Sequence, residues 1–94
     1  MTDFTANMLN DIAEEVERAR KSFPGNAHQL TAMNEEVGEL NQAMIQLEYE
    51  QGSAESVYKE AVQVAAMAIR VATEGDSTFN YVPYNSLTQT NEDK

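Results

Sequence analysis

The chain lacks cysteine and tryptophan, and it is poor in basic residues, with six of them against sixteen acidic residues among 94. Without cysteine it can form neither a disulfide nor a thiolate metal site, which excludes zinc-finger chemistry and fits a reducing cytoplasm. The formal net charge of −10 argues against binding DNA or RNA, because a grip on the phosphate backbone needs clustered Lys and Arg. Long apolar runs are also missing. The longest window, residues 64–72, contains Arg70, so we expect neither a membrane segment nor an N-terminal signal.

The residues that are present suffice for one small helical domain. At this length roughly a third of the unfolded chain's surface stays exposed after folding, so we expect the chain to associate with itself. Breakers at residues 24–26, 52–53 and 75–76 separate three expected helices, at residues 4–20, 27–51 and 54–74. We therefore predict one all-α domain over residues 1–76 and an extended, partly ordered C-terminal tail over residues 77–94.

The expected helix ends follow from local signals. Thr2 or Asp3 is the candidate N-cap of the first helix, Asn26 of the second and Ser53 of the third, and Gly75 ends the third. In the tail, aromatic residues either pin the segment to the helices or cover a nucleobase, and these residues are Phe79, Tyr81 and Tyr84.

Helical periodicity predicts which faces are buried. The first helix has a core stripe of Met8, Ile12, Ala13, Val16 and Ala19. The second has a core stripe of Met33, Val37, Leu40, Met44 and Leu47, and Glu36 and Glu39 lie along its border. The third is apolar almost all round, which predicts burial on most sides. Its single polar stripe faces either bulk water or a cleft, and consists of Glu60, Gln63, Met67, Arg70 and Glu74.

Two pairs spaced i, i+3 carry the candidate chemistry, Glu36 with Glu39 and Glu60 with Gln63. If the second and third helices pack antiparallel across the short connection at Gly52, these side chains can face one another. Oxygen ligands of this kind suit Mg²⁺ or Mn²⁺. The alternative is that the acids form an ordinary solvated helix face.

Two further residues have open roles. Arg70, on the stripe of Gln63, either contacts a phosphate of a ligand or forms a salt bridge to Glu74 or Glu48. His28, the single histidine, either binds a ligand or is a partly exposed residue at the helix start.

These motifs resemble the all-α NTP pyrophosphohydrolases, the MazG-like family, whose signature is E-E-x-x-E followed, after about two dozen residues, by E-x-x-D. Here "EEVGE" at residues 35–39 matches the first part, and "EAVQ" at residues 60–63 matches the second at Glu60 and has Gln63 in place of Asp. The stretch "FPGNAHQL" at residues 23–30 is also similar to compact members of the family.

The resemblance implies hydrolysis of an NTP or dNTP to the monophosphate and pyrophosphate, with Mg²⁺ held by Glu36, Glu39, Glu60 and Gln63. It implies that Glu35 is a further ligand or the base that orients water. It also implies a homo-oligomer, a dimer or a tetramer, whose helices form a four-helix bundle. Gln63 leaves two functions open: an enzyme in which the amide oxygen still ligates, or a non-catalytic nucleotide binder. A purely structural helical dimer is the third alternative.

Overall fold

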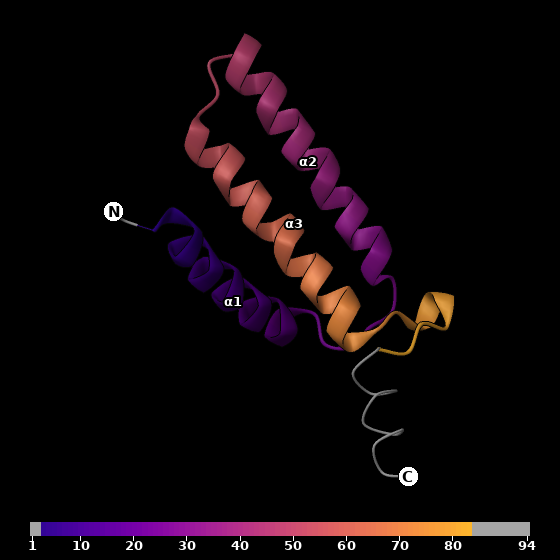
Figure 1. Ribbon diagram of the computed structural model, residues 1–94. Helices are drawn as coiled ribbons and strands as arrows, with labels where there is room; N and C mark the ends of the chain where they lie inside the picture. Colours follow the sequence, from indigo (N-terminus) through magenta and orange to yellow (C-terminus); the bar gives the residue numbers. More distant parts are fainter. Residues whose placement is uncertain (1–2, 84–94) are drawn as a thin grey trace.

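The computed structural model describes residues 3–83, and the regular secondary structure within them is helical apart from one isolated β-bridge between Asp76 and Tyr81 (Figure 1). Its elements are the helices α1 (Phe4–Ser22), α2 (Gln29–Tyr49) and α3 (Ala54–Glu74), followed by the 3₁₀ helix η1 (Ser77–Phe79). The long helices lie in one layer, with α3 between α1 and α2 and with α2 antiparallel to α3. The all-α prediction is therefore confirmed.

Two of the predicted caps are formed as expected. The Asp3 carboxylate accepts a backbone hydrogen bond from the first turn of α1, and the Ser53 hydroxyl does the same for α3. Gly75 ends α3 at φ 82°, and a Cβ atom there would lie 2.5 Å from the Tyr81 carbonyl oxygen, so the position requires glycine.

The predicted start of α2 is wrong. The helix begins at Gln29, and the preceding His28 has a left-handed backbone, φ 61°, with no side-chain cap. The cap comes instead from Asp76, whose carboxylate accepts the Leu30 N–H at 2.8 Å. Asn26, the expected cap, donates its side-chain amide to a carbonyl in the last turn of α3. The start of α2 is therefore capped by a residue that is distant in sequence.

The core lies between α1 and α3, where the buried apolar residues are Ile12, Val16, Val62 and Ala66. Together with buried Ala19, this confirms most of the predicted stripe of α1, although Ala13 is exposed. The core stripe predicted for α2 is only partly buried in a single chain. Met33 and Leu40 are half-buried, whereas Val37, Met44 and Leu47 are 44%, 53% and 41% exposed. The physical reason is that α3 is the only helix of residues 3–83 that packs against α2, so much of the apolar stripe has no neighbouring helix there.

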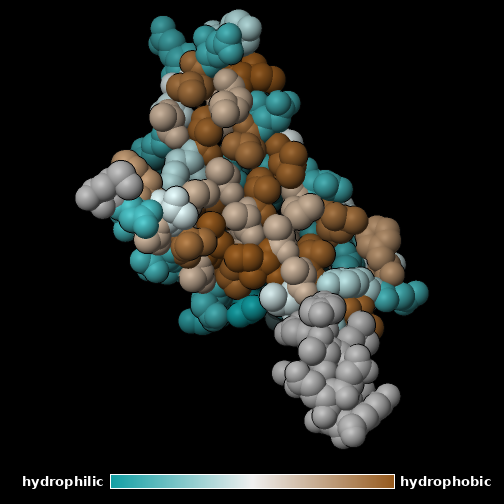
Figure 2. Space-filling view, viewed as in Figure 1, coloured by the Kyte–Doolittle hydropathy of each residue, from teal (hydrophilic) through white to brown (hydrophobic). Residues whose placement is uncertain are grey.

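The same single-layer arrangement leaves part of α3 uncovered. Ala68, Ile69 and Ala72 are exposed, so the predicted burial on most sides is also wrong for one chain. Figure 2 shows a broad band of apolar side chains over α2 and α3 on the face turned toward the viewer. We call the exposed positions Val37, Met44 and Leu47, which share one stripe of α2, the apolar face. Within residues 3–83, none of the helices has the length and apolar character needed to cross a bilayer.

The segment after α3 folds back toward the start of α2 instead of extending away. It forms η1, and Tyr81 pairs with Asp76 while its hydroxyl donates to the Ala72 carbonyl at 3.4 Å. Tyr81 therefore pins the segment to α3, which was one of the two roles predicted for the aromatic residues. Phe79 is exposed, and Tyr84, with the rest of the predicted tail, lies outside the described residues.

Candidate metal centre and adjoining cleft

Three carboxylates converge where α2 passes α3. Glu36 and Glu39 come from α2 and Glu60 from α3, and each offers an oxygen within 4.8 Å of those of the other two. The antiparallel packing brings them together because i, i+3 residues share one helix face. Glu36 and Glu60 are half-buried, and Glu39 is exposed. Their role as metal ligands stays a prediction.

The crowding of these acids changes the protonation of Glu36. The pKa of Glu36 is raised from 4.5 to about 7, first of all by partial burial and then by the neighbouring charges of Glu39 and Glu60. A hydrogen bond with Glu60 and the more distant charge of Glu15 on α1 add to the effect. Near neutral pH a substantial share of Glu36 is therefore protonated, and a bound cation would reverse that preference.

Gln63 lies against Glu36 and acts as a donor. With its side-chain nitrogen turned toward the carboxylate, the orientation that satisfies both groups, it donates to Oε1 at 2.7 Å and to Oε2 at 3.2 Å. The amide thus stabilises the charged form of Glu36, whereas an aspartate at this position would repel it. To ligate a cation, Gln63 would have to turn its oxygen toward the cluster.

The donor set fits a hard divalent cation. All three groups offer carboxylate oxygens, which Mg²⁺ and Mn²⁺ prefer. Moreover, Oε1 of Glu60 is buried and has no hydrogen-bond partner among the described residues. A buried oxygen without a partner is costly, and a cation would satisfy it.

A cleft of about 360 Å³ adjoins the carboxylates. It is lined by Glu36, which belongs to the cluster, and by Gln63, which contacts Glu36. Its remaining wall comes from α1, the α1–α2 loop, α2 and α3, and includes the apolar residues Ala19, Phe23, Pro24, Ala32, Ala66 and Met67. Such a volume lies in the range of small-molecule sites. Gln63, Met67 and Arg70 line the cleft, so the polar stripe of α3 faces a cleft in this part, as one of the two alternatives predicted.

Glu35 and His28 also line this cleft. Glu35 is exposed and is not one of the three clustered carboxylates. His28 is exposed and contacts Thr78, a residue of η1. The structure therefore brings both residues to the cleft, and their predicted roles toward a ligand stay predictions.

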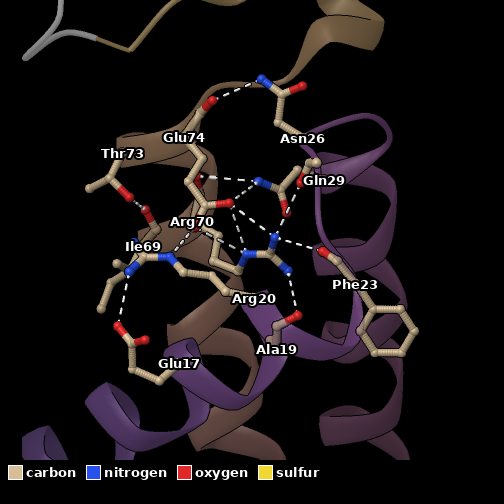
Figure 3. A network of polar contacts seen from close by, with 11 residues as sticks. Glu17, Ala19, Arg20, Phe23, Asn26, Gln29, Ile69, Arg70, Thr73 and Glu74 are labelled. Atoms are coloured by element: carbon tan, nitrogen blue, oxygen red, sulfur yellow. Dashed lines mark hydrogen bonds and ion pairs between the residues drawn. The ribbon is translucent and has the colours of Figure 1, made fainter.

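Arg70 lines the cleft but is only 2% exposed, and its guanidinium is bonded to the protein itself (Figure 3). It donates to the carbonyl oxygens of Phe23 at 2.9 Å and Gly25 at 3.2 Å, and it forms an ion pair with Glu74 at 3.0 Å. The predicted salt bridge to Glu74 is confirmed. The predicted contact with a phosphate stays a prediction, and it would compete with these bonds.

Several residues of the cleft and its support had no clear signal in the sequence. Arg18 and Gln29 line the cleft, and Asp76 and Thr78 hold its loop. Arg18 comes from α1, whose contribution could not be foreseen because nothing local indicates which helix flanks α3. In the sequence, Gly75 and Asp76 indicated only the end of α3, and nothing indicated that Asp76 would bond to the start of α2.

No protein-family model matches this chain, and neither a curated protein nor a solved structure matches it. The likeness to the all-α NTP pyrophosphohydrolases therefore depends on the motifs of residues 23–30, 35–39 and 60–63 alone.

Proposed function

We propose that the protein is a metal-dependent nucleotide pyrophosphohydrolase that converts an NTP or dNTP to the monophosphate and pyrophosphate. One observation carries this proposal: three carboxylates from two helices converge within 4.8 Å beside a cleft of about 360 Å³. The resemblance of the same residues to a pyrophosphohydrolase motif agrees with it. A cytoplasmic location, where nucleotides and Mg²⁺ occur together, belongs to the same proposal.

In this proposal Glu36, Glu39 and Glu60 hold the cation, Mg²⁺ or Mn²⁺, beside the part of the cleft that Glu36 lines. A divalent cation there supplies neutralisation of the phosphate charge and activation of water. Glu35, which lines the cleft, orients the water that attacks the α-phosphorus. Gln63 fixes the position of Glu36 by donating to it.

The cleft itself takes the nucleoside. Its apolar wall can cover a flat base, and its few polar groups can fix the orientation of that base. Because the chain carries a formal net charge of −10, a triphosphate can approach only with its cation, which makes binding dependent on metal.

The apolar face is the basis for a proposed homo-oligomer, with a second copy of this chain as the occupant. The face consists of positions with the periodicity of a helix core, and a two-fold dimer can place the same face of both copies in contact. In such a dimer α2 and α3 of each copy would form a four-helix bundle.

The second candidate function is a nucleotide binder without turnover, and Gln63 favours it. A neutral amide replaces the fourth carboxylate of the motif and donates to Glu36, so the site has one charge fewer with which to hold cations. A purely structural dimer is the third candidate, and it requires no ligand at the cleft.

The test is pyrophosphate release from a panel of NTPs and dNTPs with Mg²⁺ or Mn²⁺. Glu39→Gln and Glu60→Gln should abolish turnover, whereas Glu14→Gln, at an exposed position of α1, should not change it. In parallel, thermal shifts are measured with nucleotide and with metal. Nucleotide stabilisation without turnover, together with activity in Gln63→Asp, would favour the binder. No response to nucleotide or to metal would leave the structural dimer.

A further inference from the structure

Two arginines line the cleft, and only one of them is exposed. The guanidinium of Arg70 is buried and donates to loop carbonyls and to Glu74, so it holds the cleft wall together. The side chain of Arg18, on α1, is 57% exposed. Within the described part of the chain its guanidinium bonds only to Glu15, one turn earlier on the same helix. A positively charged group at the cleft is therefore accessible to a ligand.

The pair with Glu15 leaves one edge of the Arg18 guanidinium free to donate. Nε donates to Oε1 of Glu15 at 2.9 Å, and Nη2 donates to Oε2. A guanidinium has five N–H donors, and this fork uses one on Nε and one on Nη2. Both hydrogens of Nη1 and the second hydrogen of Nη2 remain, on the side turned away from Glu15. Such an edge matches two oxygens of a phosphate group.

Glu15 lies beside the residues that border the three carboxylates. Its side chain is only 18% exposed. Glu15 and Gln63 both line the cleft, and both also line a second hollow of about 400 Å³ beside it. Gln63 in turn donates to Glu36. A phosphate group bound to a cation at the carboxylates would therefore have the Arg18 guanidinium on the α1 side of the same cleft.

The charge of the cleft makes such a donor valuable for an anionic ligand. Three of the residues that line it are acidic, namely Glu15, Glu35 and Glu36. A triphosphate carries more negative charge than one divalent cation neutralises, so it needs further positive groups close to its oxygens. Arg70 is committed to the cleft wall, and Arg18 is the arginine that can meet this need.

We propose that Arg18, held by Glu15, binds the triphosphate of the nucleotide, while the cation at the three carboxylates binds the same group from the side of α2 and α3. This inference rests on the proposed nucleotide function. The fork with Glu15 already orders the arginine side chain, so little of its freedom is lost when the phosphate binds. Because an exposed ion pair within one helix contributes little to stability, Arg18 can be replaced without loss of the fold.

Steady-state kinetics with the preferred NTP and Mg²⁺ test the contact during turnover. Arg18→Met should raise KM at least about tenfold, as expected when a charged hydrogen bond is lost, with kcat changed less than about threefold. Arg18→Lys keeps the charge and loses the fork, so its KM should lie between those of wild type and Arg18→Met. Lys21→Met removes the same charge from α1 at an exposed position outside the cleft and should keep the wild-type KM. Equal KM values in Arg18→Met and Lys21→Met would overturn the contact and leave the proposed hydrolysis standing.

Calorimetric titration with tripolyphosphate and Mg²⁺ separates the contact from the proposed function, since it needs no turnover. Arg18→Met should bind tripolyphosphate at least about tenfold more weakly than wild type, and should bind the four deoxynucleosides, which carry no phosphate, as wild type does. An equal loss of deoxynucleoside binding would show that Arg18 only shapes the cleft, and would overturn the proposal. If wild type binds tripolyphosphate through Arg18 but hydrolyses no nucleotide, the contact stands and the proposed hydrolase fails. If wild type binds neither tripolyphosphate nor nucleotide, both fail.

Discussion

At the scale of single residues, Arg70 joins segments that are far apart in the chain. Its buried guanidinium connects α3 to the carbonyl groups that end α1 and begin the α1–α2 loop, and it pairs with Glu74. Glu74 in turn accepts from Arg20 and Gln29 (Figure 3). The shape of the cleft wall therefore depends on the buried guanidinium of Arg70, because this group is the hydrogen-bond donor to the loop carbonyls.

Arg70→Met should destabilise the fold by about 3 kcal/mol, since removing one partner leaves a partly buried carboxylate and several carbonyl groups without their donor. Urea denaturation followed by circular dichroism measures the free energy of unfolding. Lys59→Met removes an exposed ion pair with Glu55 and should cost less than about 1 kcal/mol. Equal effects of the two changes would show that the Arg70 bonds contribute little.

The free energy of unfolding should depend on pH in opposite ways through Glu36 on the one hand and through Glu74 and Asp76 on the other. The pKa of Glu36 is raised to about 7, so the stability that this group contributes is present below 4.5 and is lost as the pH rises through about 7. Hydrogen bonds from Arg70 and Arg20 lower the pKa of Glu74, and backbone donors lower that of Asp76. The contribution of these two groups is present above about pH 4 and is lost in more acidic solution.

The free energy of unfolding without metal should therefore rise by an amount on the order of 1 kcal/mol between about pH 8 and pH 5.5, and should fall again below about pH 4. Urea titrations at a series of pH values measure it. Glu36→Gln should flatten the limb between pH 8 and 5.5, and Glu14→Gln should keep it. A wild-type profile that is flat over this interval would contradict the raised pKa.

At the scale of elements, the start of α2 is the clearest difference between expectation and structure. Local signals favoured Asn26 as the cap, but this role is performed by Asp76, which lies 46 positions after Leu30, the residue whose N–H it accepts. Such a cap is invisible to local sequence patterns, because it exists only once α3 has folded back along α2. The N-caps of α1 and α3, by contrast, use the residue just before the helix, and both could be predicted.

Asp76→Ala should lower the melting temperature more than Asp3→Ala does. Asp3 caps one exposed helix end, which is typically worth about 1 kcal/mol, whereas Asp76 holds both α2 and η1. Differential scanning calorimetry gives the melting temperatures, and hydrogen exchange at the Leu30 and Thr78 amides shows whether the same bonds were lost. A larger effect of Asp3→Ala would mean that the buried carboxylate is not the main support of this end.

At the scale of the whole molecule, one layer of three helices cannot bury all of its apolar side chains. The stripe of α2 was correctly identified by its period, yet Met44 is 53% exposed because, among the helices of residues 3–83, only α3 packs against α2. The meeting of the carboxylates could likewise be predicted from spacing and antiparallel packing. The donor role of Gln63 and the wall formed by α1 could not, since both depend on the packing of helices in three dimensions.

The apolar face predicts self-association. Light scattering after size exclusion should give a mass of at least twice the 10.5 kDa of one chain. Met44→Glu should shift the mass to that of the single chain, because a charge cannot be buried there without a partner. Gln42→Glu adds the same charge at another exposed position of α2 and should leave the assembly intact. A wild-type mass of one chain at all concentrations would rule out the proposed dimer.

The most direct test of the central claim is a Mn²⁺ titration followed by electron paramagnetic resonance, in which bound Mn²⁺ loses the signal of the free ion. We predict a saturable site that Mg²⁺ competes for. Removal of a ligand in Glu60→Gln should weaken it by at least about tenfold, since even outer-shell changes cost that much, while Glu14→Gln should bind as wild type does. Absence of saturable binding, or equal affinity in Glu60→Gln and wild type, would contradict the claim that these three carboxylates hold a cation.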